Sequence, residues 1–349
     1  MLMTPGPTAV PPRVRDRLSD PMPNPDVEQE FFDTYDDVCE KLQRVYDTDD
    51  EVIVMGGEGI LGLEAAIAST VAPGDEVLCV SNGLYGDGFA DFVENYGGEA
   101  TLVGADYTDA LDIEGVEAAL EDGDYKAATM VHCETPTGTL NDIAPVLERL
   151  AEHDVLTIVD AVSSLGGTPV PSEHIDINLG ASQKAFSSPP GLTTMAVSDR
   201  AWEVAEARDS KSLYTNILPW RDTSEMFPYT HLVANVAALD ESLTMLVEEG
   251  IESVYERHEE AAAYCRERGA ELGLDLYPDA ERSAPTVTAF HVPGEAKTIQ
   301  QELESEHDIV LSTGLADLAD DILRVGHMGY NADIEKVERV MDSLASVLD

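Results

Sequence analysis

Short runs of consecutive apolar residues alternate with amphipathic segments through the first two hundred residues. Strands that are buried on both faces show such runs, and the helices between them supply crossover connections. The pattern therefore predicts an α/β fold with a mostly parallel sheet covered by helices on both faces. The predicted strands are 51–55, 76–80, 100–104, 128–132, 155–160, 177–180 and 193–198, and the predicted helices among them are 60–71, 87–97 and 145–154.

The last third of the chain shows a different pattern. Two long helical segments come first, and then strands and helices that indicate a smaller α+β unit. We place a hinge near residues 248–252, which predicts a large domain of residues 1–249, including the N-terminal segment, and a small domain of residues 250–349. The predicted elements are helices at 231–250 and 255–273, a strand at 286–294, a helix at 298–307, a strand or loop at 323–330 and a helix at 334–348.

The charge of the chain is extreme. It holds 20 basic and 69 acidic residues, for a formal net charge of −49. Such a surface repels nucleic acid and anionic membranes, so we expect neither as a partner. A disordered or basic-partner-binding chain is the alternative, but hydrophobic residues make up 43% of this one and the acids are spread between apolar segments. We therefore expect a folded protein adapted to concentrated salt, which screens its charges.

Cysteine usage and targeting signals bear on the compartment. The four cysteines are widely scattered with no paired spacing, which predicts buried thiols in a reducing compartment. The N-terminal residues MLMTPGPTAVPPRV contain no apolar signal region, and no apolar run is long enough to span a bilayer. We therefore expect a cytoplasmic protein, and we expect no metal site.

Two strand ends carry groups that suit an anionic or a cationic ligand. Chemistry in α/β folds lies at the carboxyl ends of the strands. Glycines at 56, 57 and 59 lead from a strand into a helix, where backbone amides can cradle a phosphate, although a tight turn explains glycines equally well. Asp160 directly follows an apolar strand. It either caps the next turn or is a buried acid that must meet a cation.

Two basic residues stand in unusual surroundings. Lys184 is one of six lysines and lies within GASQKAFSSPPG, a segment of small and polar residues that does not suit a solvated surface. A lysine in such a pocket has a lowered pKa and can form a Schiff base, whereas the alternative is an ordinary surface lysine. Arg324 ends an apolar segment. It is either a salt-bridge partner in an acidic protein or a planar fork for a carboxylate.

Several motifs, taken in order, give the chain a family resemblance. They resemble those of the class V aminotransferases, and most closely the alanine–glyoxylate and serine–pyruvate aminotransferase group, from about residue 4 to the C-terminus. The resemblance implies the fold of the fold-type I pyridoxal-phosphate enzymes, whose large domain has a sheet of the seven-stranded type. The motifs are PGPTAVPPRV, GEGILGLEAA, SNGLYGD, HCETPTGTL, VDAVSSLGGTP, SQKAFSSPPGL and LRVGHMGYN.

The resemblance also implies a cofactor and residue roles. Lys184 would carry pyridoxal 5′-phosphate as an aldimine and then move the proton between the substrate Cα and the cofactor. Asp160 would keep the pyridine nitrogen protonated. Tyr85 would stack on the ring, and Thr135 and Val162 would line it. The remaining matched positions are phosphate-binding Gly59, Gln183 and Thr230, cofactor-binding Gly57 and Glu58, and substrate-binding Arg324 and Gly6, of which Arg324 would grip the α-carboxylate.

Family members are dimers with shared active sites, so the resemblance implies a homodimer in which Thr230 reaches the neighbouring subunit's site. Two positions depart from the family pattern. Glu58 stands where relatives commonly have Ser or Thr, and an ionised carboxylate there must point away from a phosphate or pair with a cation. Phe227 stands where relatives often have Tyr, which removes one hydrogen bond to the phosphate.

The resemblance leaves the substrates open. Alanine, serine and aspartate all fit as donors, with glyoxylate, pyruvate or 2-oxoglutarate as acceptor. A transaminase of the 2-aminoethylphosphonate or ureidoglycine type is the main alternative. A cysteine desulfurase would need a mobile nucleophilic cysteine in the C-terminal half, where only Cys265 occurs, within a helical pattern. A non-catalytic scaffold would not need Asp160, Lys184 and Arg324 together.

Overall fold

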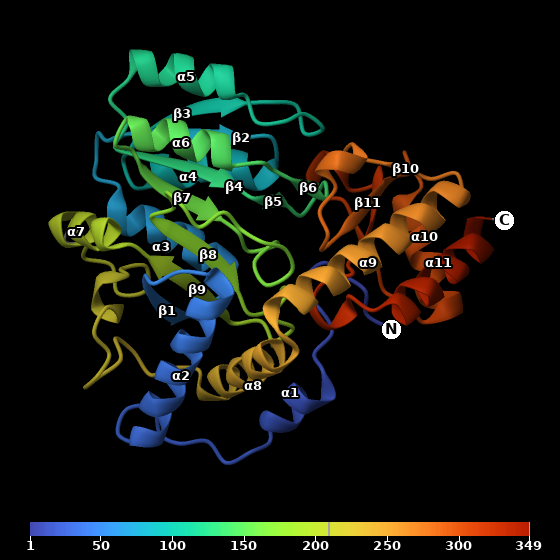
Figure 1. Ribbon diagram of the computed structural model, residues 1–349, viewed down its shortest axis with the longest axis horizontal. Helices are drawn as coiled ribbons and strands as arrows, with labels where there is room; N and C mark the ends of the chain where they lie inside the picture. The colour runs from blue at the N-terminus through green and yellow to red at the C-terminus, as the bar shows by residue number, and fades with distance from the viewer. Residues whose placement is uncertain (209, 349) are drawn as a thin grey trace.

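A seven-stranded sheet forms the centre of the molecule, in a computed structural model that describes residues 1–208 and 210–348 (Figure 1). Its strands are β1 (Glu51–Gly56), β2 (Glu76–Ser81), β3 (Glu99–Gly104), β4 (Ala127–Val131), β7 (Leu156–Asp160), β8 (Ile177–Ala181) and β9 (Leu192–Val197). They lie in the order β1-β9-β8-β7-β4-β2-β3. β9 runs antiparallel to both β1 and β8, and the other neighbours are parallel, which confirms the mostly parallel sheet.

Both faces of the central strands are buried, which is why their sequences are apolar without alternation. In β2, Val77 and Cys79 join a hydrophobic cluster that contains the large helices of one face. Leu78 and Val80, which point the other way, join a second cluster with residues of two further helices on the opposite face. The same division by odd and even positions holds in β4 and β7, so the sheet is a middle layer between two layers of helices.

Helices of the N-terminal two-thirds cover this sheet. α2 and α3 lie on the face of the first cluster, and α5 and α6 lie on the other. The helices are α1 (Pro12–Arg17), α2 (Gln29–Tyr46), α3 (Gly59–Thr70), α4 (Leu84–Asn95), α5 (Ile113–Asp122), α6 (Ala144–Glu152), α7 (Asp199–Arg208) and α8 (Val233–Glu249). A short hairpin of β5 (Cys133–Glu134) and β6 (Thr139–Leu140) and the 3-10 helix η1 (Leu218–Trp220) complete this part.

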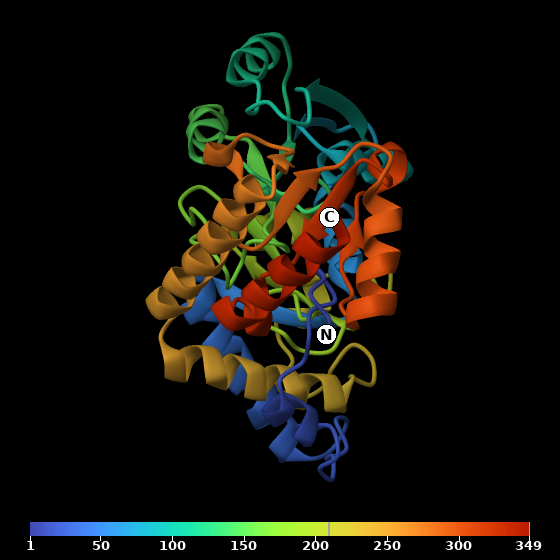
Figure 2. The same ribbon diagram turned by 90° about the vertical axis from the view of Figure 1, so that its right-hand side faces the viewer.

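The C-terminal part has its own antiparallel sheet and its own core (Figure 2). The sheet order is β10-β11-β13-β12, and helices α9 to α11 pack on it. The elements are α9 (Ile251–Glu271), β10 (Asp275–Leu276), η2 (Ala280–Arg282), β11 (Thr288–His291), α10 (Ala296–His307), β12 (Ser312–Thr313), η3 (Ala316–Leu318), β13 (Ile322–Val325), η4 (Gly329–Asn331) and α11 (Ile334–Leu348).

The first residues of the chain belong to this second core. Met3 is fully buried among the apolar residues of the C-terminal part, and its N–H donates to the carbonyl of Val310 at 2.9 Å. Both chain termini accordingly lie on this side of the molecule in Figures 1 and 2. α8 ends at Glu249 and α9 begins at Ile251, with Gly250 between them at a φ of 89°. A domain boundary at this glycine stays a prediction, and the packing of Met3 would assign the first residues to the C-terminal unit.

The predicted elements agree well with the observed ones. All seven predicted strands of the first 200 residues correspond to the seven strands of the large sheet, and every predicted helix is present within a few residues of its expected bounds. Four observed helices were not predicted: α1, α2, α5 and α7. Among the described residues, no helix combines the length and the apolar character needed to cross a membrane.

Candidate active site

Lys184 lies in the loop between β8 and β9, and its side chain runs beneath the N-terminal segment. Its Nζ donates a hydrogen bond to the carbonyl of Pro5 at 3.1 Å. A Cβ atom at Gly6 would lie 2.6 Å from Lys184 Cδ and 2.9 Å from Nζ, and Gly6 has a φ of 123°. Only glycine therefore allows the segment to pass this close to the lysine. The predicted substrate-binding residue Gly6 thus touches Lys184 directly.

Burial changes the proton affinity of Lys184. Removal from water is the main cause that lowers the pKa of Lys184, the charge of Asp160 opposes it, and the charge of Arg324 adds to it, which brings the pKa to about 8. A fraction of this amine is therefore neutral near pH 7, as a nucleophilic amine must be. The lysine is not the solvated surface residue that was the alternative interpretation.

Asp160 is the last residue of β7, opposite Leu179 of the neighbouring β8. Its Oδ1 accepts a hydrogen bond from the Val162 N–H at 2.8 Å, so it does cap the following turn. Burial raises the pKa of Asp160 to about 6, and the Val162 N–H and the charge of Lys184 counteract this. The capping role and the role as a buried acid near a cation therefore coexist in one side chain.

Arg324 reaches the same site from β13 of the C-terminal part. Its Nε donates to the Thr313 carbonyl at 2.8 Å, and its Nη1 donates to the Thr135 carbonyl at 3.1 Å. The residue is only 6% exposed, and burial lowers its pKa to about 10. Among the residues that the structure describes, no carboxylate lies within ion-pair distance of Arg324 or Lys184. Arg324 is buried and Lys184 is half-buried, and cations removed from water in this way are costly without a bound anion.

The glycine turn after β1 leads directly into α3. Gly57 has a φ of 155°, and a Cβ there would lie 2.2 Å from Leu61 Cδ2. A Cβ at Gly59 would lie 3.2 Å from Cγ2 of Val162, the residue predicted to line the ring. These contacts explain the glycines by close approach, and they place the start of α3 beside the Asp160 turn.

Glu58 is exposed and caps the helix that it precedes. Its Oε1 accepts a hydrogen bond from the Ile60 N–H at 3.2 Å. Of the two expected arrangements, pairing with a cation is not observed among the described residues. The carboxylate instead accepts a hydrogen bond from one of the N–H groups at the helix start, which leaves one fewer donor for a phosphate.

Tyr85 stands in the first turn of α4 and is held by an acid that sequence reasoning missed. The Tyr85 and Gly86 N–H groups donate to the two carboxylate oxygens of Glu134, at 3.2 and 2.7 Å. Glu134 is fully buried, and burial raises its pKa to about 7 despite these two bonds. A Cβ at Gly83 would lie 2.2 Å from Glu134 Cδ. The acid within HCETPTGTL and the glycine within SNGLYGD were the available signals.

The remaining predicted residues fall into two groups. Thr135 is buried and its hydroxyl is hydrogen-bonded to Ser163, in the turn that follows Asp160. Gln183 is also buried, and its Oε1 has no hydrogen-bond partner in the described part of the chain. Thr230, by contrast, is exposed, with its hydroxyl 3.3 Å from Asp26 Oδ2. The structure thus brings the predicted residues together at one edge of the sheet except for Thr230, which lies on the outer surface.

Phe227 has a packing role in this chain, and the loss of a phosphate hydrogen bond at this position stays a prediction. Its ring is 5% exposed and packs at 4.9 to 5.2 Å from the rings of Phe31, Phe32 and Tyr35. The phenylalanine therefore serves an aromatic core cluster in this chain.

Comparison with known proteins identifies the family. The model of the family "Aminotransferase class-V" matches residues 2–340. The chain belongs to the class-V aminotransferase family. An uncharacterized aminotransferase of Methanocaldococcus jannaschii is 35% identical, over 99% of this chain and 91% of the relative.

Solved structures agree. The alanine–glyoxylate aminotransferase of Nostoc sp. has a TM-score of 0.95 and 29% identity, with 100% of this chain and 95% of that chain covered. The ureidoglycine–glyoxylate aminotransferase of Bacillus subtilis has a TM-score of 0.95 and 29% identity, with coverage of 99% and 92%. The family, the fold of the pyridoxal-phosphate transaminases and the transaminase class are therefore confirmed.

The setting of Lys184 predicts how its amine titrates in protein prepared free of cofactor. Acylation of residue 184 by acetic anhydride, followed by peptide mapping across pH, should show a midpoint near pH 8. In Asp160→Asn the midpoint should shift to lower pH, because the carboxylate that stabilises the ammonium is gone. Lys297, whose side chain is 53% exposed, is the internal control and should be labelled alike in both proteins. A midpoint that does not move would mean that Asp160 does not act on the lysine.

Proposed function

We propose that this transaminase moves an amino group from a small amino acid to a 2-oxo acid, with pyridoxal 5′-phosphate as its cofactor on Lys184. Alanine, serine or aspartate is the donor, and glyoxylate or pyruvate is the acceptor. The observation that carries the proposal is a pair of cations, half-buried Lys184 and buried Arg324, that lie at one site with no ion pair to a carboxylate among the described residues. The amine of Lys184 can form a Schiff base with an aldehyde, and the guanidinium of Arg324 can bind a carboxylate.

The residues present fit the cofactor. Gln183 is buried and its Oε1 has no partner within the described chain, so its side-chain amide is not committed through that oxygen. The N–H groups of this amide, and not its oxygen, are the donors that a phosphate would accept from. The turn at Gly57 and Gly59 is packed against Leu61 and Val162 so closely that a Cβ would collide, and it brings the amides at the start of α3 beside Val162. We assign the phosphate to this turn, Gly57 to Gly59, together with Gln183. Asp160 lies at the end of β7, next to β8, which leads to Gln183, and there it would meet the pyridine nitrogen.

Each group then has a defined task. When bound, the cofactor supplies an electron sink for the carbon that loses its proton. Asp160 holds a proton on the ring nitrogen, Tyr85 covers the ring, and Thr135 and Val162 border it. The amine of Lys184 takes the proton from the substrate Cα and returns it, a task that a pKa of about 8 suits at neutral pH. Arg324 fixes the α-carboxylate, so that the Cα proton is aimed at the lysine.

A ureidoglycine-type transaminase is the second candidate, because the solved structure of that name matches this chain as well as the alanine–glyoxylate enzyme does. A cysteine desulfurase is disfavoured. Cys265 is completely buried within α9 against Met341, and burial raises the pKa of its thiol to about 12. A buried thiol in a helix interior is neither ionised nor free to move.

We propose a homodimer with shared active sites. Exposed apolar side chains lie close to the glycine turn: Leu232 approaches Gly56, and Tyr214 packs on Tyr229, whose hydroxyl accepts from the Gly56 N–H at 2.9 Å. Tyr214 is 57% exposed and Leu232 is 43% exposed. Apolar groups exposed together around a site suit burial by a second copy. Thr230, exposed on the same segment, would then donate to the phosphate in the partner's site.

The test of the proposed function is a screen of single amino acids against the cofactor-loaded protein. Conversion of the cofactor from its aldehyde to its amine form, followed by absorbance, identifies the donors. Borohydride reduction should attach the cofactor to residue 184, and Lys184→Ala should abolish both signals while Lys297→Ala leaves them unchanged. Label on another lysine, or no donor among the amino acids, would contradict the proposal.

Replacement of Arg324 by lysine tests the carboxylate site. A point charge replaces a bidentate fork, so the KM for the amino donor should rise about tenfold or more while cofactor content stays constant. Arg221→Lys is the matched control, because that guanidinium pairs with acids at the surface. An unchanged KM in Arg324→Lys would move the carboxylate site elsewhere.

The charge of −49 predicts a dependence on salt. The Debye length falls from about 10 Å at 0.1 M to about 3 Å at 1 M, so molar KCl removes most of the repulsion within and between subunits. Activity, dimer and bound cofactor should be lost together in dilute buffer and retained in molar KCl. Sedimentation and activity measured across one KCl series check this. A dimer that stays fully active at low salt would show that the acidic surface is no salt adaptation.

A further inference from the structure

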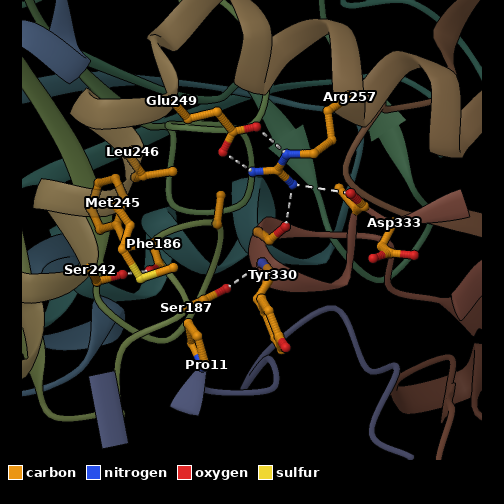
Figure 3. Close-up of a pocket in the computed structure, with 13 residues that line it drawn as sticks. Pro11, Phe186, Ser187, Ser242, Met245, Leu246, Glu249, Arg257, Tyr330 and Asp333 are labelled. Carbon is orange, nitrogen blue, oxygen red and sulfur yellow. Dashed lines mark hydrogen bonds and ion pairs between the residues drawn. The ribbon is translucent and has the colours of Figure 1, made fainter. Parts of the chain in front are cut away.

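The three residues that follow Lys184 run along a cavity of about 240 Å³ (Figure 3). α8, α9, η4 and Pro11 form the other walls. On this side the loop therefore has no dense packing against it, and discrete hydrogen bonds must hold it. One of them joins the hydroxyl of Ser242, on α8, to the carbonyl of Phe186.

Ser187 joins the lysine loop to two segments that are distant in sequence. Its Oγ accepts from the Tyr330 N–H at 2.8 Å and lies 3.2 Å from the Thr8 hydroxyl. Its own N–H donates to the Lys184 carbonyl at 2.9 Å, and its φ is 54°, in the left-handed region that a serine seldom adopts. Strained backbone of this kind persists where surrounding contacts enforce it.

The segment that contains Tyr330 is also held in place, by contacts to the neighbouring Gly329. Gly329 has a φ of 60°, and a Cβ there would lie 2.1 Å from Ser187 Oγ and 2.5 Å from the Ala185 carbonyl oxygen. The Gly329 N–H donates to His258 Nε2 at 2.8 Å, and its carbonyl accepts from Arg257 Nη1 at 2.6 Å. The backbone of Gly329 is thus bonded on both polar groups and pressed against the lysine loop.

Arg257 fixes this arrangement to the end of α8. Its guanidinium donates to both oxygens of Glu249, at 2.6 and 3.1 Å, and its Nη1 also donates to the Ala332 carbonyl at 3.1 Å (Figure 3). Glu249 and Arg257 stand on opposite sides of Gly250, where the chain turns from α8 into α9. One side chain therefore ties η4 to the junction of the two helices.

We propose that Ser187 is a positioning residue that sets the separation between Lys184 and Arg324. Ser187 follows Lys184 by three residues, and Tyr330 follows Arg324 by six. Their hydrogen bond is therefore a short strap between the loop that carries the amine and the segment that carries the guanidinium. This inference rests on the proposed function, in which both groups must act on one amino acid, the first at Cα and the second at its carboxylate.

A positioning role has a signature that a purely structural role lacks. Without the strap, each cation keeps its own contacts, because Lys184 still bonds Pro5 and Arg324 still bonds Thr135 and Thr313. Each should therefore still bind a ligand that uses it alone. Only an amino donor, which needs Lys184 and Arg324 at the correct separation, should react poorly.

The experiment compares Ser187→Ala with Ser188→Ala in the cofactor-loaded enzyme. Ser188 is the matched control, because its buried hydroxyl has no hydrogen-bond partner within the described residues. In Ser187→Ala we expect kcat/KM for the amino donor to fall about tenfold, since small misplacements of reacting groups cost up to about a hundredfold. Inhibition by propionate, a carboxylate without an amine, and borohydride labelling of residue 184 should stay within about twofold of wild type. Ser188→Ala should match wild type in all three.

A second variant, Arg257→Lys, weakens the support of the segment that carries Tyr330. It should likewise lower kcat/KM for the amino donor while propionate inhibition and labelling of residue 184 stay near wild type. Its control is Arg149→Lys, because Arg149 is an exposed arginine paired to Glu117. Equal kcat/KM in Ser187→Ala and Ser188→Ala would overturn the inference. So would a parallel loss of propionate binding, labelling and turnover, because that result indicates general destabilisation. A wild-type enzyme that transfers no amino group would overturn the proposed function itself, which distinguishes the two failures.

Discussion

The constraint on which this site depends is that two cations, buried Arg324 and half-buried Lys184, have no carboxylate within ion-pair distance among the residues that the structure describes. With 69 acidic residues in the chain, this requires that the nearby acids be oriented by other partners. The structure shows how this is achieved. Asp160 accepts from the Val162 N–H, Glu134 from those of Tyr85 and Gly86, and Glu58 from that of Ile60. These N–H groups orient the carboxylates without neutralising them, and no ion pair forms between them and either cation among the described residues.

The same device limits the phosphate cradle. The Ile60 N–H donates to Glu58 and is therefore not free to donate to a phosphate. A carboxylate at the start of a helix also already interacts with the positive end of the helix dipole. The remaining donors within the chain come from the glycine turn and from the buried amide of Gln183. Because the chain itself supplies few donors, a donor from a second subunit would contribute a larger share of the phosphate binding. In the proposed dimer, retention of the cofactor would therefore depend on assembly.

Much of this organisation could be predicted from the sequence. Strands buried on both faces must be apolar runs, and this made the central strands of the large sheet recognisable, whereas the largely exposed edge strand β3 was recognisable from its short apolar segment alone. The ends of these strands directed attention to Asp160 and Lys184. α2 was missed although Phe31, Tyr35, Val38 and Leu42 follow a helical spacing, because the adjacent acids obscured the apolar stripe. Glu134 and Ser187 act through backbone N–H groups distant in sequence, and no local pattern reveals such partners. The packing of Met3 beside residue 310 is likewise a tertiary outcome.

Arg324 illustrates how fold and chemistry share one side chain. Two of its five N–H donors are spent on the Thr313 and Thr135 carbonyls, which lie on the C-terminal part and on the large sheet's side respectively. The guanidinium therefore crosses the junction of the two parts before any substrate arrives, and three donors remain. Because carbonyls do not neutralise its charge, the tie costs nothing in attraction for a carboxylate. In the proposed function, Arg324 would therefore position the substrate relative to both parts of the chain, and a shift of one part against the other would change the geometry at the substrate Cα.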